Sequence, residues 1–209
     1  QGVSSAASDV YKRQKHDSVQ GQETFKSLHD VPGRVDLAII CTPAMSVPGI
    51  IEQCGERGVR FALIVSSGFA ERGHAGAALE RKVLEIARSY SVRILGPNSL
   101  GIMRPPSRLN ATFTQERAHE GKMALVSQSG AICSAILDWA LPNNVGFSSV
   151  VSLGRSSDID FGEILDYLVH DPRTHYILLY IEGIQNARLF LSALRSAARI
   201  KPILPVSYT

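Results

Sequence analysis

Short apolar runs alternate with longer amphipathic segments along most of this chain. Two runs of strand length, Asp36 to Thr42 and Phe61 to Val65, are each followed by a loop and a segment with helical spacing. Ser46, followed by Pro48 in a first turn, predicts the start of one helix, and apolar residues three and four apart predict another over Ala77 to Tyr90. Fully apolar strands between amphipathic helices are typical of a parallel sheet, so the pattern predicts an α/β fold.

A second series of the same kind follows. Its predicted strands are Met123 to Val126, a strand containing Val150 and Val151, Tyr176 to Ile181, and Pro202 to Leu204. Its predicted helices are one with Ile132, Ile136 and Trp139 on one face, one lined by Phe161, Ile164, Leu165 and Leu168, and one over Ala187 to Ala198. Between the two series, Arg104 to Glu120 contains Pro105-Pro106 and few periodic apolar residues, which favours a connector. We therefore expect units over 15–103 and 121–204, with parallel strands in each and residues 104–120 between them.

The two ends of the chain lack this alternation of apolar runs and amphipathic segments. Residues 1–14 (QGVSSAASDVYKRQ) have no apolar period and no hydrophobic region of a secretory signal, and residues 205–209 read PVSYT. Both segments resemble translations of sequencing-adapter DNA, although a pair of native disordered tails is the alternative. We expect residues 15–204 to be an internal piece of a longer protein.

Composition narrows the function classes. The 209 residues are 44% hydrophobic and 20% charged, with a formal net charge of +3, as in an ordinary packed protein. No apolar run approaches the roughly 20 residues that span a bilayer, and dispersed Lys and Arg residues disfavour nucleic acid as a partner. Cys41, Cys54 and Cys133 have no close spacing, which predicts buried thiols without a metal site or disulfide framework and is typical of the cytoplasm.

One turn has the chemistry of an anion site. Ligands of open α/β sheets bind beyond the carboxyl ends of strands, and Ser127 to Gly130 lies between a predicted strand and a helix. Hydroxyl groups, a glycine and the backbone N–H groups of a helix start predict phosphate as a ligand. A plain helix cap at Ser129 is the alternative. The turn contains neither of the phosphate-binding motifs GxGxxG and GxxxxGK[ST], so its spacing alone does not indicate a nucleotide. The absence of GxGxxG before an acidic residue also disfavours a nicotinamide-binding Rossmann protein.

Several ordered motifs carry a family resemblance. They are VRILGPNSLGIM (92–103), GKMALVSQSGAICSAILDWA (121–140), SLGRSSDIDFGEILDYLVHDPRTHYILLYIEGI (152–184) and KPIL (201–204). Together they resemble the NDP-forming acyl-CoA synthetase superfamily, which includes the succinyl-CoA synthetase α subunit and ADP-forming acetyl-CoA synthetase. The segments AILDWA, DFGEILDYL and LLYIEGI are most similar in sequence to those of bacterial members in which this module is fused to a GNAT acetyltransferase domain acting on protein lysines.

The resemblance implies a fold and a set of site residues. The fold is a Rossmann-like CoA-binding domain, truncated at its N-terminus, followed by a flavodoxin-like domain of the succinyl-CoA-synthetase type, truncated at its C-terminus. Glu182 resembles the carboxylate that orients a phosphorylated histidine, and Asp158 and Asp160 match an acidic motif that helix capping explains equally well. The residues implied to bind CoA are Lys15, Thr42, Pro43, Ala44, Ser66, Ser67, Gly68, Phe69 and Asn98, and those implied to bind phosphate are Ser127, Ser129 and Gly130.

The implied reaction converts acyl-CoA, ADP and phosphate to carboxylate, ATP and CoA through an acyl phosphate and a phosphohistidine. That histidine belongs downstream of residue 209, and ATP or ADP with Mg would bind only through an ATP-grasp domain or subunit that this chain lacks. His74, in Gly73-His74-Ala75-Gly76, imitates a phosphohistidine loop but lies in the CoA-binding half, and the other five histidines have no matching context. We expect no complete turnover from this chain alone, and no metal site.

The sequence leaves two hypotheses about the function open. The chain is either part of an acyl-CoA ligase or a CoA-sensing module that regulates an attached GNAT acetyltransferase without ligase activity.

Overall fold

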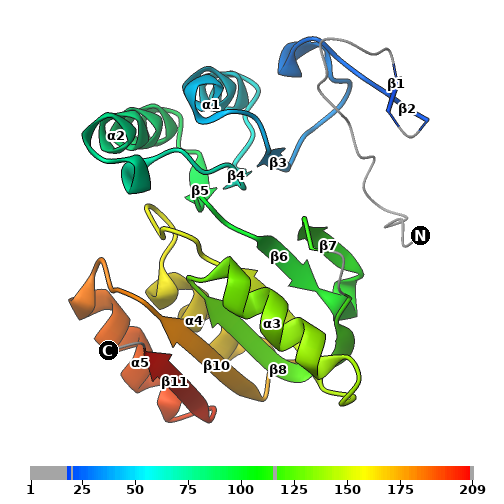
Figure 1. The fold of residues 1–209 in the computed structure, drawn as a ribbon, viewed down its shortest axis with the longest axis vertical. Helices are drawn as coiled ribbons and strands as arrows, with labels where there is room; N and C mark the ends of the chain where they lie inside the picture. Colours follow the sequence, from blue (N-terminus) through cyan, green and yellow to red (C-terminus); the bar gives the residue numbers. More distant parts are fainter. Residues whose placement is uncertain (1–17, 20, 115–116, 208–209) are drawn as a thin grey trace. The chain divides into compact units, whose positions relative to one another are not determined.

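The computed structural model describes residues 18–19, 21–114 and 117–207. Lys15 and the segment 1–14 lie outside the described residues. Contacts divide the described chain into two compact units: one holds the residues up to Ala62 together with Gly68–Arg93, and the other holds Leu63–Ser67 and the residues from Ile94 onward. Each unit is an α/β structure, as Figure 1 shows.

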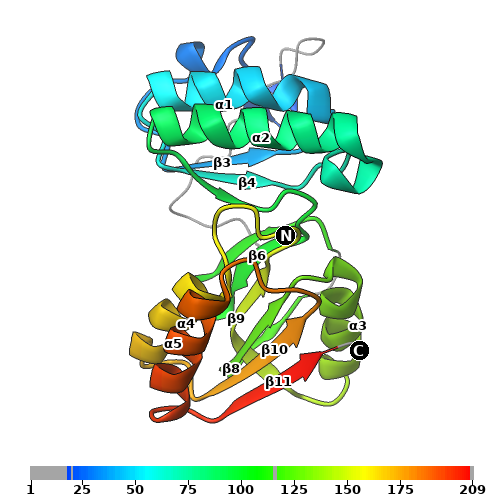
Figure 2. The same ribbon diagram turned by 90° about the vertical axis from the view of Figure 1, so that its left-hand side faces the viewer.

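A three-stranded sheet has the order β3-β4-β5, with β3 Leu37–Ile40, β4 Phe61–Ile64 and β5 Arg93–Leu95. β3 belongs to the first unit, whereas the boundary between the two units falls within β4 and within β5. Helices α1 (Val47–Glu56) and α2 (His74–Ser89) lie side by side over this sheet (Figure 2). The short elements are β1 Ser18–Val19, β2 Gln22–Glu23, and the 3-10 turns η1 Leu28–Asp30, η2 Ala44–Ser46 and η3 Ala70–Arg72.

Helix α1 shows which part of the local prediction is correct. It buries Val47, Ile51 and Cys54, whose spacing places them on one face, and Pro48 stands in its first turn as expected. Ser46 stands at the N-cap position but does not cap the helix, because its backbone is already helical there. Its hydroxyl instead lies 2.7 Å from the carbonyl oxygen of Pro43.

The second unit contains a six-stranded sheet in the order β11-β10-β8-β9-β6-β7. Its strands are β6 Gly101–Arg104, β7 Leu109–Thr112, β8 His119–Ser127, β9 Gly146–Ser152, β10 Tyr176–Ile181 and β11 Ile203–Ser207, and the 3-10 turn η4 spans Pro105–Ser107. The four strands β11, β10, β8 and β9 are parallel, and β6 and β7 add an antiparallel edge. Helix α3 (Gly130–Ala140) covers one face, while α4 (Phe161–His170) and α5 (Ala187–Ala198) cover the other (Figure 2).

The α/β class with parallel sheets is confirmed, and β10 and α5 begin and end where the pattern predicts. The prediction that residues 104–120 only connect the units is wrong, because this stretch contains β7 and the start of β8. The tight approach of β6 to β7 depends on Gly101: its φ is +116°, and a Cβ there would lie 2.0 Å from the carbonyl oxygen of Ala111. The last strand also extends beyond Leu204 to Ser207.

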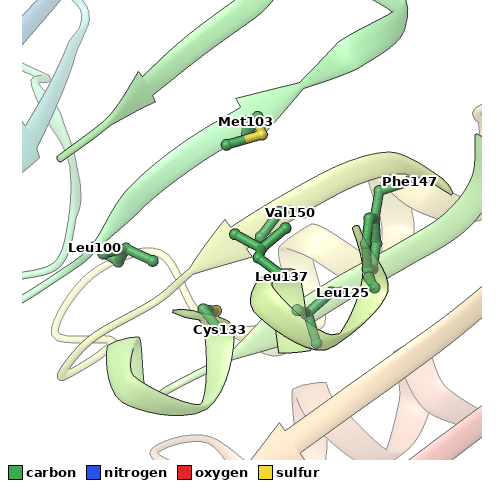
Figure 3. Close-up of a cluster of buried hydrophobic side chains, with 8 residues drawn as sticks. Leu100, Met103, Leu125, Cys133, Leu137, Phe147 and Val150 are labelled. Atoms are coloured by element: carbon green, nitrogen blue, oxygen red, sulfur yellow. The ribbon is translucent and has the colours of Figure 1, made fainter. Parts of the chain in front are cut away.

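The core of the second unit lies between α3 and the sheet (Figure 3). Its buried residues are Leu100, Met103, Leu125, Cys133, Leu137, Ala140, Phe147 and Val150. The inward face of α3 is therefore formed by Cys133, Leu137 and Ala140, whereas Trp139 is 61% exposed. Of the three thiols, Cys54 and Cys133 are buried as expected, but Cys41 is exposed.

Candidate functional site

The strand order of the second unit creates a crevice at one end of its sheet. Strands β8 and β10 are neighbours, but the chain leaves β8 toward α3 on one face and leaves β10 toward α5 on the other. At such a switch point the two outgoing loops separate and leave space beyond the carboxyl ends of the strands. The loops concerned are Gln128-Ser129, after β8, and residues 182–186, after β10.

The first of these loops ends in a well-formed helix start. Ser129 is the N-cap of α3, and its Oγ accepts a hydrogen bond from the backbone N–H of Ile132 at 3.3 Å. Gly130 is the first residue of the helix, so no Cβ from this position narrows the approach to the exposed N–H groups. Those groups and the helix dipole favour an anion. The cap and the anion site are therefore compatible features of one turn.

Ser127 does not face this site. It is 0% exposed, its Oγ donates to the carbonyl oxygen of Ser129 at 2.9 Å and accepts from the N–H of Ser129 at 3.0 Å. Burial raises the pKa of the adjacent Cys133 thiol to about 11, although a hydrogen bond with Ser127 acts in the opposite direction. Ser127 thus shapes the turn from the inside, and Cys133 stays protonated at neutral pH.

A cavity of about 460 Å³ opens in front of the helix start. It is lined by Asn98, Ser99, Leu100, Phe113, Gln128, Ser129, Gly130, Ala131, Ser134 and Glu182. The structure therefore brings together four of the predicted site residues, Asn98, Ser129, Gly130 and Glu182, which are as far as 84 positions apart in sequence (182 − 98). Most of the lining residues are polar or small, and Leu100 and Phe113 supply apolar surface.

The loop that carries Asn98 is braced by the loop after β9. The N–H of Arg155 donates to the carbonyl oxygen of Pro97 at 3.0 Å, and the N–H of Ser157 donates to the carbonyl oxygen of Gly96 at 3.2 Å. Asn98 has a φ of +57°, a conformation that asparagine tolerates better than most residues. These backbone bonds fix the side of the cavity on which Asn98 lies.

The two aspartates of the acidic motif have structural partners. Asp160 is the N-cap of α4 and forms a capping box with Glu163. Asp158 Oδ2 accepts the N–H of Ile94 at 2.7 Å and so ties the loop after β9 to β5. Neither residue lines the cavity, and the capping interpretation of Asp160 is correct.

Several of the residues implied to bind CoA lie just after two strands. Thr42, Pro43 and Ala44 lie in the segment after β3, and Gly68 and Phe69 lie in the segment after β4. Gly68 (φ +111°) approaches Ala44 closely, since a Cβ at Gly68 would lie 3.0 Å from that of Ala44. Phe69 is 0% exposed, so its ring packs inside the unit and supports the loop. The N–H groups of Gly68 and Phe69 are held by the Glu71 carboxylate.

The other CoA candidates are placed differently. The carbonyl oxygen of Ser66 accepts the N–H of Asn98 at 3.0 Å, and Ser67 is exposed. Lys15 lies outside the described residues. Six of the residues implied to bind CoA are thus exposed or partly exposed in the segments after β3 and β4 and stay candidates: Thr42, Pro43, Ala44, Ser66, Ser67 and Gly68.

Gln128 is the residue that the sequence did not single out. Its side chain lines the cavity and forms four hydrogen bonds, three of them to the backbone of Glu182 and Gly183. Nothing in the local pattern identifies a partner 54 residues away (182 − 128). The available signal is the SQSG motif itself, in which Gln128 stands between the two serines of the turn.

His74 is the exposed first residue of α2 and lies in the first unit. We predict that the chain mixed with ATP and Mg²⁺ acquires no acid-labile, base-stable phosphate on His74. We also predict that His74→Ala changes the free energy of unfolding by less than about 0.5 kcal/mol, as at other exposed positions. Phosphate analysis of the isolated chain and chemical denaturation test the two statements. A phosphorylated His74 would show that its loop is a phosphoryl acceptor.

None of the helices in the described part of the chain combines the length and the apolar character of a membrane span. The same part of the chain contains no group of three or more His, Cys, Asp or Glu side chains arranged to hold a metal ion.

Comparisons with known proteins agree with this architecture. Residues 10–105 match a family described as a CoA binding domain, and residues 120–207 match one described as a succinyl-CoA ligase like flavodoxin domain. Acetate–CoA ligase [ADP-forming] I of Archaeoglobus fulgidus is 42% identical over 190 residues, which are 91% of this chain and 28% of that protein. The α subunit of acetate–CoA ligase [ADP-forming] I of Pyrococcus furiosus is 40% identical over 184 residues, 88% of this chain and 40% of the subunit.

A solved structure of the dinucleotide forming acetyl-coenzyme A synthetase 1 of Ca. Korarchaeum cryptofilum, in complex with phosphate and ADP, superposes with a TM-score of 0.90. It is 37% identical, and the match covers 95% of this chain and 43% of that one. The chain thus spans less than half the length of these relatives. The chain therefore consists of a Rossmann-like CoA-binding domain followed by a flavodoxin-like domain of the succinyl-CoA ligase type. The chain belongs to the NDP-forming acyl-CoA synthetase superfamily and corresponds to the α-subunit portion of ADP-forming acetyl-CoA ligases.

Proposed function

We propose that this chain supplies the CoA-binding and phosphate-binding part of an ADP-forming acyl-CoA ligase. The observation that carries the proposal is the cavity at the start of α3, where Ser129 and Gly130 meet Asn98 and Glu182. Phosphate binds at the helix N–H groups, and the apolar surface of Leu100 and Phe113 accepts a short acyl group. The accessible residues after β3 and β4 hold CoA.

In the proposed reaction, a phosphate oxygen attacks the carbonyl carbon of the acyl thioester. A C–O bond forms, the C–S bond breaks, and CoA leaves as a thiolate that takes up a proton. The N–H groups at the start of α3 hold the phosphate in place and offset its charge. Glu182, at the edge of the same cavity, orients the histidine that then receives the phosphoryl group. That histidine and the ATP-grasp module with its Mg²⁺ and nucleotide come from outside residues 1–209.

Phosphate binding tests the site in this chain alone. We expect titration with inorganic phosphate, followed by amide NMR, to give saturating shifts at Ser129, Gly130 and Ala131. A solvated anion at a helix start should have a dissociation constant around millimolar, equivalent to roughly 4 kcal/mol. Gly130→Val should abolish the shifts, because the side chain fills the approach to the N–H groups. A Cβ at Gly130 would lie 3.4 Å from the Cβ of Leu100, which also lines the cavity.

Two further variants separate binding from folding. Ser129→Ala should weaken phosphate binding and lower the free energy of unfolding by about 1 kcal/mol, because it removes the cap. Ala135→Val, at an exposed position of the same helix, should leave phosphate binding unchanged. Shifts that do not saturate, or that persist in Gly130→Val, would leave the turn as a helix cap only.

The alternative is a CoA-sensing module attached to a GNAT acetyltransferase. Such a module would bind CoA at the same residues, but its function would require no phosphate site. Calorimetric titration with acetyl-CoA therefore accompanies the NMR experiment. Binding of both acetyl-CoA and phosphate supports the ligase, whereas binding of acetyl-CoA alone supports the sensor.

A further inference from the structure

The side chain of Gln128 forms three of its four hydrogen bonds with the loop after β10. Its Oε1 accepts the N–H groups of Glu182 at 2.7 Å and Gly183 at 2.9 Å, and its Nε2 donates to the carbonyl oxygen of Gly183 at 2.8 Å. Nε2 also donates to Ser156 Oγ at 3.2 Å. The reverse orientation of the amide would set NH₂ against two N–H donors, so the pattern fixes the orientation. A single side chain thus satisfies the backbone of two consecutive residues.

The loop that Gln128 holds has little other anchorage from packing. Every residue from 182 to 189 is exposed, and the first buried residue after Ile181 is Phe190 in α5. The Glu182 side chain is itself exposed at the cavity. Its position is consequently set by the backbone to which it is attached, and that backbone is bound by Gln128.

Gln128 also belongs to the anion-binding turn. It directly precedes the N-cap Ser129, and its own N–H donates to the carbonyl oxygen of Tyr180 at 3.2 Å. The two loops that diverge at the switch point between β8 and β10 are therefore connected across the crevice by this residue. A carboxylate beside a phosphate site repels the anion, so its distance from the helix start has a direct effect on binding.

We propose that Gln128 is a positioning residue of the phosphoryl site, which fixes the Glu182 carboxylate relative to the N-terminus of α3. The inference rests on the proposed function, because it assigns the anion site to phosphate. It goes beyond that function by assigning the geometry of Glu182 to one amide side chain. Gln128 acts through Glu182 and need not touch the transferred group.

A double-mutant cycle on the whole chain tests this coupling. The variants are Glu182→Gln, Gln128→Met, which retains volume without the hydrogen bonds, and their combination, each titrated with inorganic phosphate by amide NMR. In the wild-type background, Glu182→Gln should tighten phosphate binding about fivefold, because it removes a nearby like charge. In the Gln128→Met background, the same change should have less than about a twofold effect, since the loop no longer holds the carboxylate in place.

A conservative variant provides the rescue. Gln128→Glu retains the oxygen that accepts the N–H groups of Glu182 and Gly183, so most of the Glu182→Gln effect should return even though the added charge weakens phosphate binding overall. Without phosphate, hydrogen exchange at the amides of Glu182 and Gly183 should be at least about tenfold faster in Gln128→Met, with exchange within α3 unchanged.

The outcomes separate the two proposals. Saturable phosphate binding with the same Glu182→Gln effect in every background would overturn the role of Gln128 and leave the phosphate site intact. Equal loss of coupling in the Met and Glu variants would also overturn it, since that result indicates a general packing role. Absence of saturable binding in the wild-type chain would refute the phosphate site and, with it, this inference.

Discussion

Asp171→Asn should lower the free energy of unfolding by about 3 kcal/mol, because it breaks a buried ion pair. The two Asp171 carboxylate oxygens accept hydrogen bonds from Arg104 Nη1 and Nη2, both at 3.0 Å, and the aspartate side chain is only 3% exposed. Thr174 Oγ1 also donates to Asp171 at 2.8 Å, and the Arg104 guanidinium lies 5.6 Å from the centre of the Tyr167 ring. Chemical denaturation measures the loss.

The surface pair between Arg34 and Asp36 is a matched control. Its atoms are 2.8 Å apart, but both side chains are more than 70% exposed. Solvent screens such a pair, so Asp36→Asn should change the free energy of unfolding by less than about 0.5 kcal/mol. Equal effects at Asp171 and Asp36 would show that burial of the Arg104 pair contributes nothing.

The same aspartate predicts a dependence of stability on pH. Burial alone would raise the pKa of Asp171, but hydrogen bonds from Arg104, Thr174 and the Arg173 N–H outweigh it and lower the pKa from 3.8 to about 2. Because the folded pKa is depressed, this stabilisation is present above pH 3.8 and is lost as the pH falls toward 2. It amounts to about 2 kcal/mol, and Asp171→Asn should remove it from the pH profile.

Gly154→Ala should lower the free energy of unfolding by about 3 kcal/mol through strain and a clash. Gly154 has a φ of +56°, and a Cβ there would lie 2.3 Å from the carbonyl oxygen of Pro97 and 2.6 Å from that of Asn98. The contacting atoms are backbone, so the loop that carries Asn98 must move. We also expect weaker phosphate binding, because Asn98 lines the cavity.

Gly58→Ala is the control for conformation without a clash. Gly58 has a φ of +69°, and a Cβ there meets no atom within 4 Å. The expected cost is about 1 kcal/mol, which is the penalty of a left-handed conformation for alanine. If both substitutions cost the same in thermal or chemical unfolding, the close packing at Gly154 has no energetic weight.

Local features of the sequence were sufficient for the elements that depend on periodicity and capping. β10 and α5 have their predicted bounds, and α3 begins at the turn that Ser129 caps. The prediction that Ser46 caps a helix was wrong, because its side chain has two possible hydrogen-bond partners nearby. Ser46 stands at the N-cap position of α1, but its hydroxyl donates to the carbonyl oxygen of Pro43 and does not cap the helix. Trp139 has the spacing of a core residue yet lies on the exposed side of α3, because α3 is apolar on more than one face.

The α/β class, the order of strands and helices in each series, and the turn from Ser127 to Gly130 as an anion-site candidate could all be predicted, since each depends on residues a few positions apart. Long-range contacts were needed to show that β6 and β7 join the second sheet, that Ser127 and Phe69 turn inward, and that Gln128 binds the backbone of Glu182. These outcomes depend on which distant segments become neighbours when the sheet forms. Strand order and burial select those neighbours, and neither is encoded in the spacing of residues along one segment.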